Sequence, residues 1–197
     1  MINYVDRMAD ALVDVLKYSN SEVEWPKTSD LRPNDGVRSE WLYPAIESSD
    51  YSEITSILQY TQQEAVFDEI GELLLGIALV EMKHYAGVRD AIVALGGKLP
   101  QPYSSKNVKI GTSPVEALTL AIESEIATIE FYKSVEVKLS QDTDSVIIMK
   151  QLLNKLIADE SLHLKLLNKY LKGLLNDEQK YNSIIGKWLP KIKLYIE

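Results

Sequence analysis

The chain has only two histidines, and each lies three residues after a glutamate, in Glu81-Met82-Lys83-His84 and Glu160-Ser161-Leu162-His163. Residues i and i+3 share a face of an α-helix, so each pair can offer a carboxylate and an imidazole to one metal ion. Both pairs lie in the middle of apolar stripes that repeat at steps of three and four. A carboxylate in a helix core is costly unless it is protonated, paired or bound to a cation. No basic residue shares these stripes, so an external cation is the expected partner.

Hydrophobic periodicity predicts an all-α fold with four amphipathic helices. The clearest start is Ser113-Pro114-Val115-Glu116, a capping box with proline at the first helical position. Gly96-Gly97 is the predicted end of the second helix, and Gly173 that of the fourth. The predicted helices span about 49–67, 70–95, 113–139 and 144–172.

Short polar turns near residue 68 and at residues 141–145 make these helices two antiparallel hairpins. The stretch 96–112, which is rich in Gly, Pro and Ser, is long enough to run the length of a bundle as a crossover connection. We therefore expect a four-helix bundle over 49–173. An N-terminal extension, 1–48, with one helix from Asn3 to Tyr18, and a C-terminal extension, 174–197, with a short amphipathic piece ending near Pro190, pack on this bundle or meet a partner.

The first and third helices carry a matching pattern, in which a glutamate precedes a tyrosine by seven residues: Glu53 and Tyr60, then Glu125 and Tyr132. Seven residues make nearly two helical turns, so each glutamate shares a face with its tyrosine. As core aromatics, the two tyrosines either pack or orient a carboxylate through the hydroxyl. The chain thus consists of two related hairpins, each with Glu and Tyr on one helix and Glu-x-x-His on the next.

Hairpin geometry tests whether these groups meet. Two groups lie at one height in an antiparallel pair when the turn falls halfway between them. The midpoint of Glu53 and the first Glu-His pair is about 68, and that of Glu125 and the second pair is about 143. Both midpoints coincide with the turns inferred from composition. The predicted metal ligands therefore converge on one layer: Glu53, Glu81, His84, Glu125, Glu160 and His163.

Four carboxylates suit two divalent ions, and oxygen-rich sites with some imidazole favour Fe(II), Mn(II) or Zn(II) over copper or calcium. We expect Glu81 and Glu160 to be shared between the ions, and Glu53 and Glu125 to be terminal. The cofactor prediction is two divalent transition-metal ions, Fe or Mn, or Zn in the purified protein. Glu64 and Glu136, four residues after each tyrosine, lie near the turns and are expected to be solvated.

Composition excludes several other classes. The chain of 197 residues is 46% hydrophobic and has no cysteine, which rules out disulfides, thiolate metal sites and a cysteine nucleophile. A net charge of −8 without a basic cluster argues against nucleic-acid binding. No signal sequence is visible, and the apolar run 73–80 is too short to span a membrane. We expect a cytoplasmic protein with no membrane association that forms a homo-oligomer, a dimer or larger.

A glutamate on each of two helices and Glu-x-x-His on two others resembles the ferritin-like di-metal carboxylate proteins, which include ferritin, rubrerythrin and manganese catalase. Residues 53–97 look closest to small bacterial rubrerythrin-like or manganese-catalase-like proteins. The resemblance covers about 50–172. It implies a ferritin-like four-helix bundle with a di-metal centre that reacts with dioxygen or hydrogen peroxide, and it carries the family's ligands onto the six residues named above.

Two departures argue against the rubrerythrin route to peroxidase chemistry. The chain has no cysteine for a rubredoxin domain, and Thr128 stands where those enzymes carry an extra glutamate. Disproportionation of peroxide by a manganese pair needs no external electron donor, so a catalase- or peroxidase-like oxidoreductase is the leading hypothesis. The alternatives are non-catalytic iron binding and storage, or a bundle that uses metal only for stability.

Overall fold

The computed structural model describes residues 15–47, 49–100 and 106–196, and every regular element in these ranges is helical. The prediction of an all-α fold is confirmed. The predicted helix from Asn3 lies outside the described residues, except for its end, which is a 3-10 turn, η1 (Val15–Tyr18). No described helix combines the length and apolar character needed to span a bilayer.

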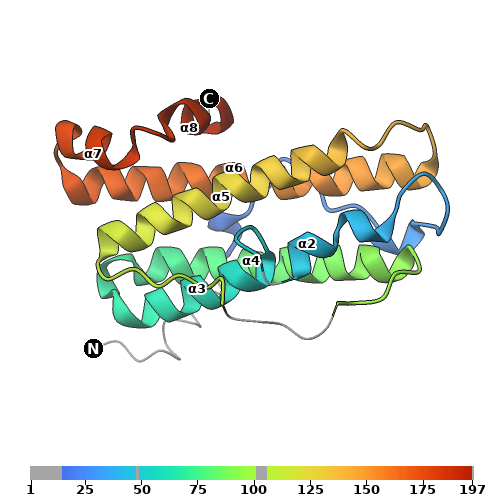
Figure 1. Ribbon diagram of the computed structural model, residues 1–197, viewed down its shortest axis with the longest axis horizontal. Coiled ribbons are helices and arrows are strands. Elements are labelled where there is room, and N and C mark those ends of the chain that lie inside the picture. Colours follow the sequence, from blue (N-terminus) through green and yellow to red (C-terminus); the bar gives the residue numbers. More distant parts are fainter. Residues whose placement is uncertain (1–14, 48, 101–105, 197) are drawn as a thin grey trace.

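Four long helices form two antiparallel hairpins that lie against each other (Figure 1). Only Phe67 separates the first two helices, so α4 folds directly back along α3. The connection from α4 to α5 joins opposite ends of the structure, as predicted for a crossover, and contains residues 101–105, which are not described. The long helices are α3 (Glu53–Val66), α4 (Asp68–Ala94), α5 (Pro114–Glu136) and α6 (Asp144–Leu175).

Side-chain caps start three of these helices. Ser52, Ser113 and Thr143 each accept a hydrogen bond from the backbone N–H three residues later, which satisfies a group that the helix leaves unpaired. In the predicted capping box at α5, the Glu116 carboxylate accepts from Thr112 N at 2.7 Å rather than from Ser113 N. The helix therefore starts where the sequence predicts, with its second cap bond displaced by one residue.

The fourth helix does not end at Gly173, as the sequence suggested, but continues to Leu175. Its end is set by Asn176, which adopts a left-handed conformation with φ of 45°. Gly173 lies on the exposed side of α6, with no neighbouring atom within 4 Å of where its Cβ would lie. A glycine in such a position weakens a helix without ending it.

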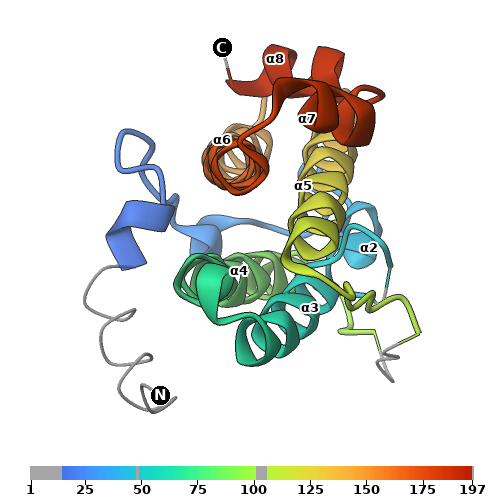
Figure 2. The same cartoon turned by 90° about the vertical axis from the view of Figure 1, so that its left-hand side faces the viewer.

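The flanking segments cover different sides of the four helices. Residues 15–41 run along the side formed by α4 and α6, whereas α2 (Tyr43–Ile46) packs on α3 and α4 (Figure 2). The tail contains two helices, α7 (Glu178–Ile185) and α8 (Leu189–Ile196), which pack on α6. The amphipathic helix α7 ends at Ile185, a few residues before the predicted end near Pro190, and this proline instead lies in the first turn of α8, where its missing N–H costs nothing.

Two apolar clusters fill the interior, one toward each end of the four helices. One includes α4 residues up to Val80 and α6 residues from Leu164 onward. The other includes α4 from Val88 onward and α6 up to Leu156. Both Glu-x-x-His pairs fall in the interval between the two clusters, so the apolar core brackets a polar layer on these helices.

The exposed glycine of α6 gives a stability prediction. Replacing Gly173 with alanine should raise the free energy of unfolding by roughly 0.5–1 kcal/mol, because alanine loses less backbone entropy in a helix. Urea denaturation measures the change. As a contrast, Gly111→Ala should destabilise the protein, since its Cβ would lie 2.5 Å from the backbone nitrogen of Ala117. Equal midpoints for the two variants would contradict this reading.

Candidate metal centre

All six predicted ligands meet in the polar layer, and each is at most 2% exposed. One comes from α3, two from α4, one from α5 and two from α6. They form two overlapping groups, in each of which one ligand atom per residue lies within 4.8 Å of the others. The first group is Glu53, Glu81, His84 and Glu160, and the second is Glu81, Glu125, Glu160 and His163. Glu81 and Glu160 thus belong to both groups, whereas Glu53 and Glu125 belong to one each.

The Nδ1 atom of each imidazole faces three carboxylates. His84 Nδ1 lies 3.5 Å from Glu53 Oε2, 3.3 Å from Glu81 Oε2 and 3.1 Å from Glu160 Oε1. On the other side, His163 Nδ1 lies 3.1 Å from Glu81 Oε1, 3.6 Å from Glu125 Oε2 and 3.3 Å from Glu160 Oε2. The two rings stack with their centroids 5.8 Å apart. The layer therefore has two halves, each centred on one Nδ1 atom.

The opposite nitrogen of each ring is a hydrogen-bond donor. His84 Nε2 donates to Asp159 Oδ2 at 3.1 Å, and His163 Nε2 donates to the backbone carbonyl of Tyr18 at 2.8 Å. A neutral histidine with its proton on Nε2 has its lone pair on Nδ1. In that form, these bonds direct the lone pair of each ring into the layer, where it could bind a metal ion.

Two tyrosine hydroxyls tie the hairpins together. Tyr60 of α3 donates to Glu125 Oε1 at 2.5 Å, and Tyr132 of α5 donates to Glu53 Oε1. Each tyrosine thus orients the glutamate of the other hairpin. Of the two roles that the sequence left open for these residues, the structure shows the carboxylate contact, and both rings are also fully buried.

Burial and mutual repulsion change the pKa values of the layer. Burial, with the Glu81 charge added, raises the pKa of Glu53 to about 8, and the same causes raise that of Glu160 well above its usual range. Burial alone would raise the pKa of Glu81, but the adjacent imidazoles of His163 and His84 hold it well below its usual range. Without metal, the layer therefore keeps protons on some of its carboxylates.

The two imidazoles also hold protons, but here the cause is the neighbouring carboxylates and not burial. Burial alone would lower their pKa, but the charge of Glu160 near His84 and the carboxylate of Glu125 near His163 raise both pKa values well above the usual range. Bound protons thus supply the positive charge that the buried carboxylates require.

One polar pair of this region was missed by the sequence analysis. Lys155 is 2% exposed and pairs with the fully buried Asp159, with 2.9 Å between Nζ and Oδ1. The sequence analysis inferred that no basic residue shares the apolar stripes and so did not foresee this buried lysine. Lys155 pairs with Asp159, the acceptor of the His84 hydrogen bond, and with none of the six ligands. The available signal was the i, i+4 spacing of Lys155 and Asp159, with the aspartate directly before Glu160.

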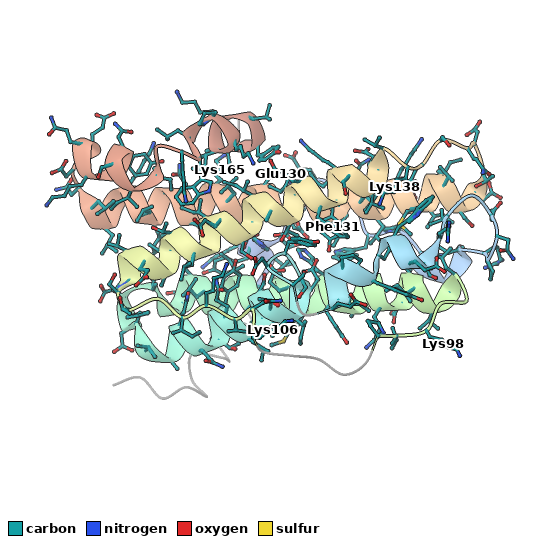
Figure 3. The ribbon with its side chains drawn as sticks, viewed as in Figure 1. Lys98, Lys106, Glu130, Phe131, Lys138 and Lys165 are labelled. Carbon is teal, nitrogen blue, oxygen red and sulfur yellow. The ribbon has the colours of Figure 1, made fainter. Side chains whose placement is uncertain are left out.

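The prediction that Glu64 is solvated is wrong. Glu64 is fully buried, because the last turn of α3 packs inside the structure. Glu136 is half-buried. Two further glutamates of α5, Glu123 and Glu130, belong to neither ligand group and pair with lysines of the C-terminal extension. Glu123 contacts Lys187, and Glu130, labelled in Figure 3, contacts Lys191 of α8 at 2.6 Å.

The first group passes a test of fit for a cation. Four buried atoms of its residues have no hydrogen bond within the described part of the chain: Glu53 Oε2, His84 Nδ1 and Glu160 Oε1 in the His84 half, and Glu81 Oε1, which faces His163. A buried polar atom without a partner costs free energy, and such atoms are rare in folded proteins. Carboxylate oxygens and an imidazole nitrogen are suitable donors for a divalent transition metal. The residues present therefore fit a metal ion.

No protein-family model matches this chain, and no curated protein matches it significantly. The functional interpretation consequently depends on the arrangement of the side chains themselves.

The raised pKa values predict that the metal-free protein loses stability as the pH rises from about 5 to about 8. Each of these groups binds its proton more tightly when folded, so its contribution is complete below its ordinary pKa and is lost toward its folded pKa. The window starts at 4.5 and ends at about 8 for Glu53, and it starts at 6.5 for the histidines. The lowered pKa of Glu81 changes stability only below 4.5.

Thermal unfolding of chelator-treated protein across this range measures the effect. Since a bound cation replaces the protons, added metal should raise the melting temperature more at pH 8 than at pH 5.5. A metal-free melting temperature that is flat or that rises with pH would contradict the charge assignment.

Proposed function

We propose that this chain is a ferritin-like di-metal carboxylate protein whose buried layer holds two divalent transition-metal ions. The observation that carries the proposal is the pair of overlapping ligand groups, which share Glu81 and Glu160 and leave four buried donor atoms without hydrogen bonds. Glu53 and His84 would complete one half, and Glu125 and His163 the other. Four helices in two antiparallel hairpins with a crossover support the ferritin-like topology.

Charge balance favours two ions over one. The four carboxylates carry four negative charges when ionised, and two divalent ions neutralise them while the imidazoles stay neutral. Fe(II), Mn(II) and Zn(II) all accept this mixture of oxygen and nitrogen donors. One ion would leave part of the charge uncompensated in a layer that is closed to solvent.

We propose an oxidoreductase that acts on hydrogen peroxide or dioxygen, most simply by disproportionating peroxide. Bound Mn or Fe would supply the redox chemistry for such a reaction. The chain's own residues contribute the surroundings. Tyr60 and Tyr132 fix the terminal carboxylates through their hydroxyls, and the apolar clusters at both ends keep bulk water away from the layer.

Three measurements on the full chain from its own host test this function: elemental analysis, oxygen release from peroxide, and particle size after Fe(II) loading. We expect two Mn or Fe per chain and sustained oxygen release. A large particle that accumulates many irons per chain would instead show iron storage. Bound metal without either behaviour would show a stabilising role, and a chain without metal would overturn the proposal.

Removing a ligand should lower metal content and thermal stability together. His84→Ala and His163→Ala each delete a donor from the layer, and Glu160→Gln removes a negative charge from it. Metal content should therefore fall from two ions toward one or none, and the metal-dependent rise in melting temperature should shrink. Metal analysis and thermal unfolding measure both.

Glu64→Gln is the matched control, because it neutralises another buried glutamate that belongs to neither ligand group. It should change stability but leave the metal content at two. If the three ligand variants keep the wild-type metal content, these side chains are not ligands.

A further inference from the structure

The segment Tyr18–Trp25, here called the strap, lies along the α4–α6 side of the structure (Figure 2). Tyr18 contacts the imidazole of His163, and Trp25 contacts that of His84. The strap contains no regular helix beyond its first residue. Sequence periodicity gave it no role, since it belongs to neither hairpin. Its contacts nevertheless reach both halves of the metal centre.

The first anchor of the strap is Tyr18. Its backbone carbonyl accepts the hydrogen bond from His163 Nε2 at 2.8 Å. Its ring lies directly against the backbone of α4 at Gly76, where an added Cβ would be 2.1 Å from Cε2 of the ring. Only a glycine leaves room for this ring, so the side chain of Tyr18 and the carbonyl that holds His163 are positioned together.

The second anchor is a buried polar cluster around Asp159. Asn20 N donates to Asp159 Oδ1 at 2.5 Å, and Lys155 Nζ donates to Ser19 Oγ at 3.0 Å and to the Asn20 carbonyl at 2.5 Å. Asp159 in turn holds His84. The strap thus supplies partners to a buried lysine and a buried carboxylate, and a buried charge that loses its partners is strongly destabilising.

The third anchor is Trp25, whose ring centroid lies 6.0 Å from that of His84. It lies against Gly87 of α4, where an added Cβ would be 2.8 Å from Cζ3 of the ring. Gly76 and Gly87 are eleven residues apart, about three helical turns, so they lie on the same side of α4. The Nζ of Lys83 lies 4.8 Å from the centroid of the Trp25 ring, on the outer side of the helix.

This inference rests on the metal centre proposed above. We propose that the strap locks both imidazoles in their metal-binding orientation. Detachment of the strap from α4 and α6 then limits the rate at which metal leaves. With the strap in place, neither ring can turn its Nδ1 out of the layer without breaking the bond at Nε2. With the strap detached, His163 loses its acceptor and Asp159 loses its backbone donor, so both rings gain freedom at once. Tyr18, Asn20 and Lys155 are therefore positioning residues that act through the histidines.

Glycine-to-alanine variants test the strap without touching a ligand. Gly76→Ala pushes on the ring of Tyr18, Gly87→Ala pushes less on Trp25, and Gly173→Ala is the control, because nothing lies near its Cβ. Each full-length variant is loaded with Zn²⁺, its metal content is determined, and the release of Zn²⁺ to excess EDTA is followed. We expect release to be about tenfold or more faster for Gly76→Ala, raised less for Gly87→Ala, and unchanged for the control.

A second measurement separates positioning from general destabilisation and remains informative if Gly76→Ala fails to fold. Because the chain has two histidines, ¹⁵N-labelled imidazoles of the Zn²⁺-loaded protein give two resolved sets of signals. Both rings should carry the proton on Nε2, and exchange of these protons with water should accelerate in Gly87→Ala but not in Gly173→Ala.

Two outcomes overturn the proposal, and they are distinct. If the wild-type chain binds no Zn²⁺, the metal centre itself is wrong, and the strap proposal falls with it. If all variants bind two ions and release them at the wild-type rate, with unchanged Nε2 proton exchange, the metal centre stands and the strap does not control it.

Discussion

Burying four glutamates in one layer requires positive charge at the same depth, and the surrounding structure is organised around that requirement. The apolar clusters on both sides exclude water, which makes an uncompensated carboxylate costly. Protons on the imidazoles and on Glu53 and Glu160 meet the requirement in the absence of metal. Two divalent cations would supply the same positive charge as four protons. The same constraint explains why both tyrosine hydroxyls point into the layer, since each reduces the charge density on one carboxylate.

The helices and the ligand layer were accessible from the sequence because they follow from periodicity and helix rise. The capping box at Ser113 predicted the start of α5, and the turn midpoints brought the six ligands to one height. Helix ends were predicted less well. Gly173 resembled a stop, but a glycine ends a helix only when the backbone changes conformation there, and that change occurs at Asn176. Glu64 was misplaced because nearness to a turn says little about what packs over it.

The hydrogen bonds that the two histidines make through Nε2 could not be predicted from periodicity and helix rise. They depend on a segment without periodicity, which contributes two backbone groups, Tyr18 O and Asn20 N. A backbone carbonyl or amide has no signature in a sequence, because every residue except proline supplies both. Asp159 and Lys155 did have a local signature in their spacing, yet two charged residues four apart on a helix usually lie on its solvated face. Their burial follows from the strap that covers them.

The contacts within the layer are reciprocal, and this has a consequence for the two halves of the site. Glu53 and Tyr60 of the first hairpin correspond to Glu125 and Tyr132 of the second. Each tyrosine contacts the glutamate of the other hairpin, so the two contacts are equivalent. The equivalence stops one residue before the shared glutamates, where Asp159 in the second hairpin corresponds to Val80 in the first. His84 is therefore backed by an anion and His163 by a neutral carbonyl. The imidazole of His84 is therefore the more electron-rich of the two, and that of His163 is the less basic. The two halves of an otherwise twofold layer are thus chemically inequivalent.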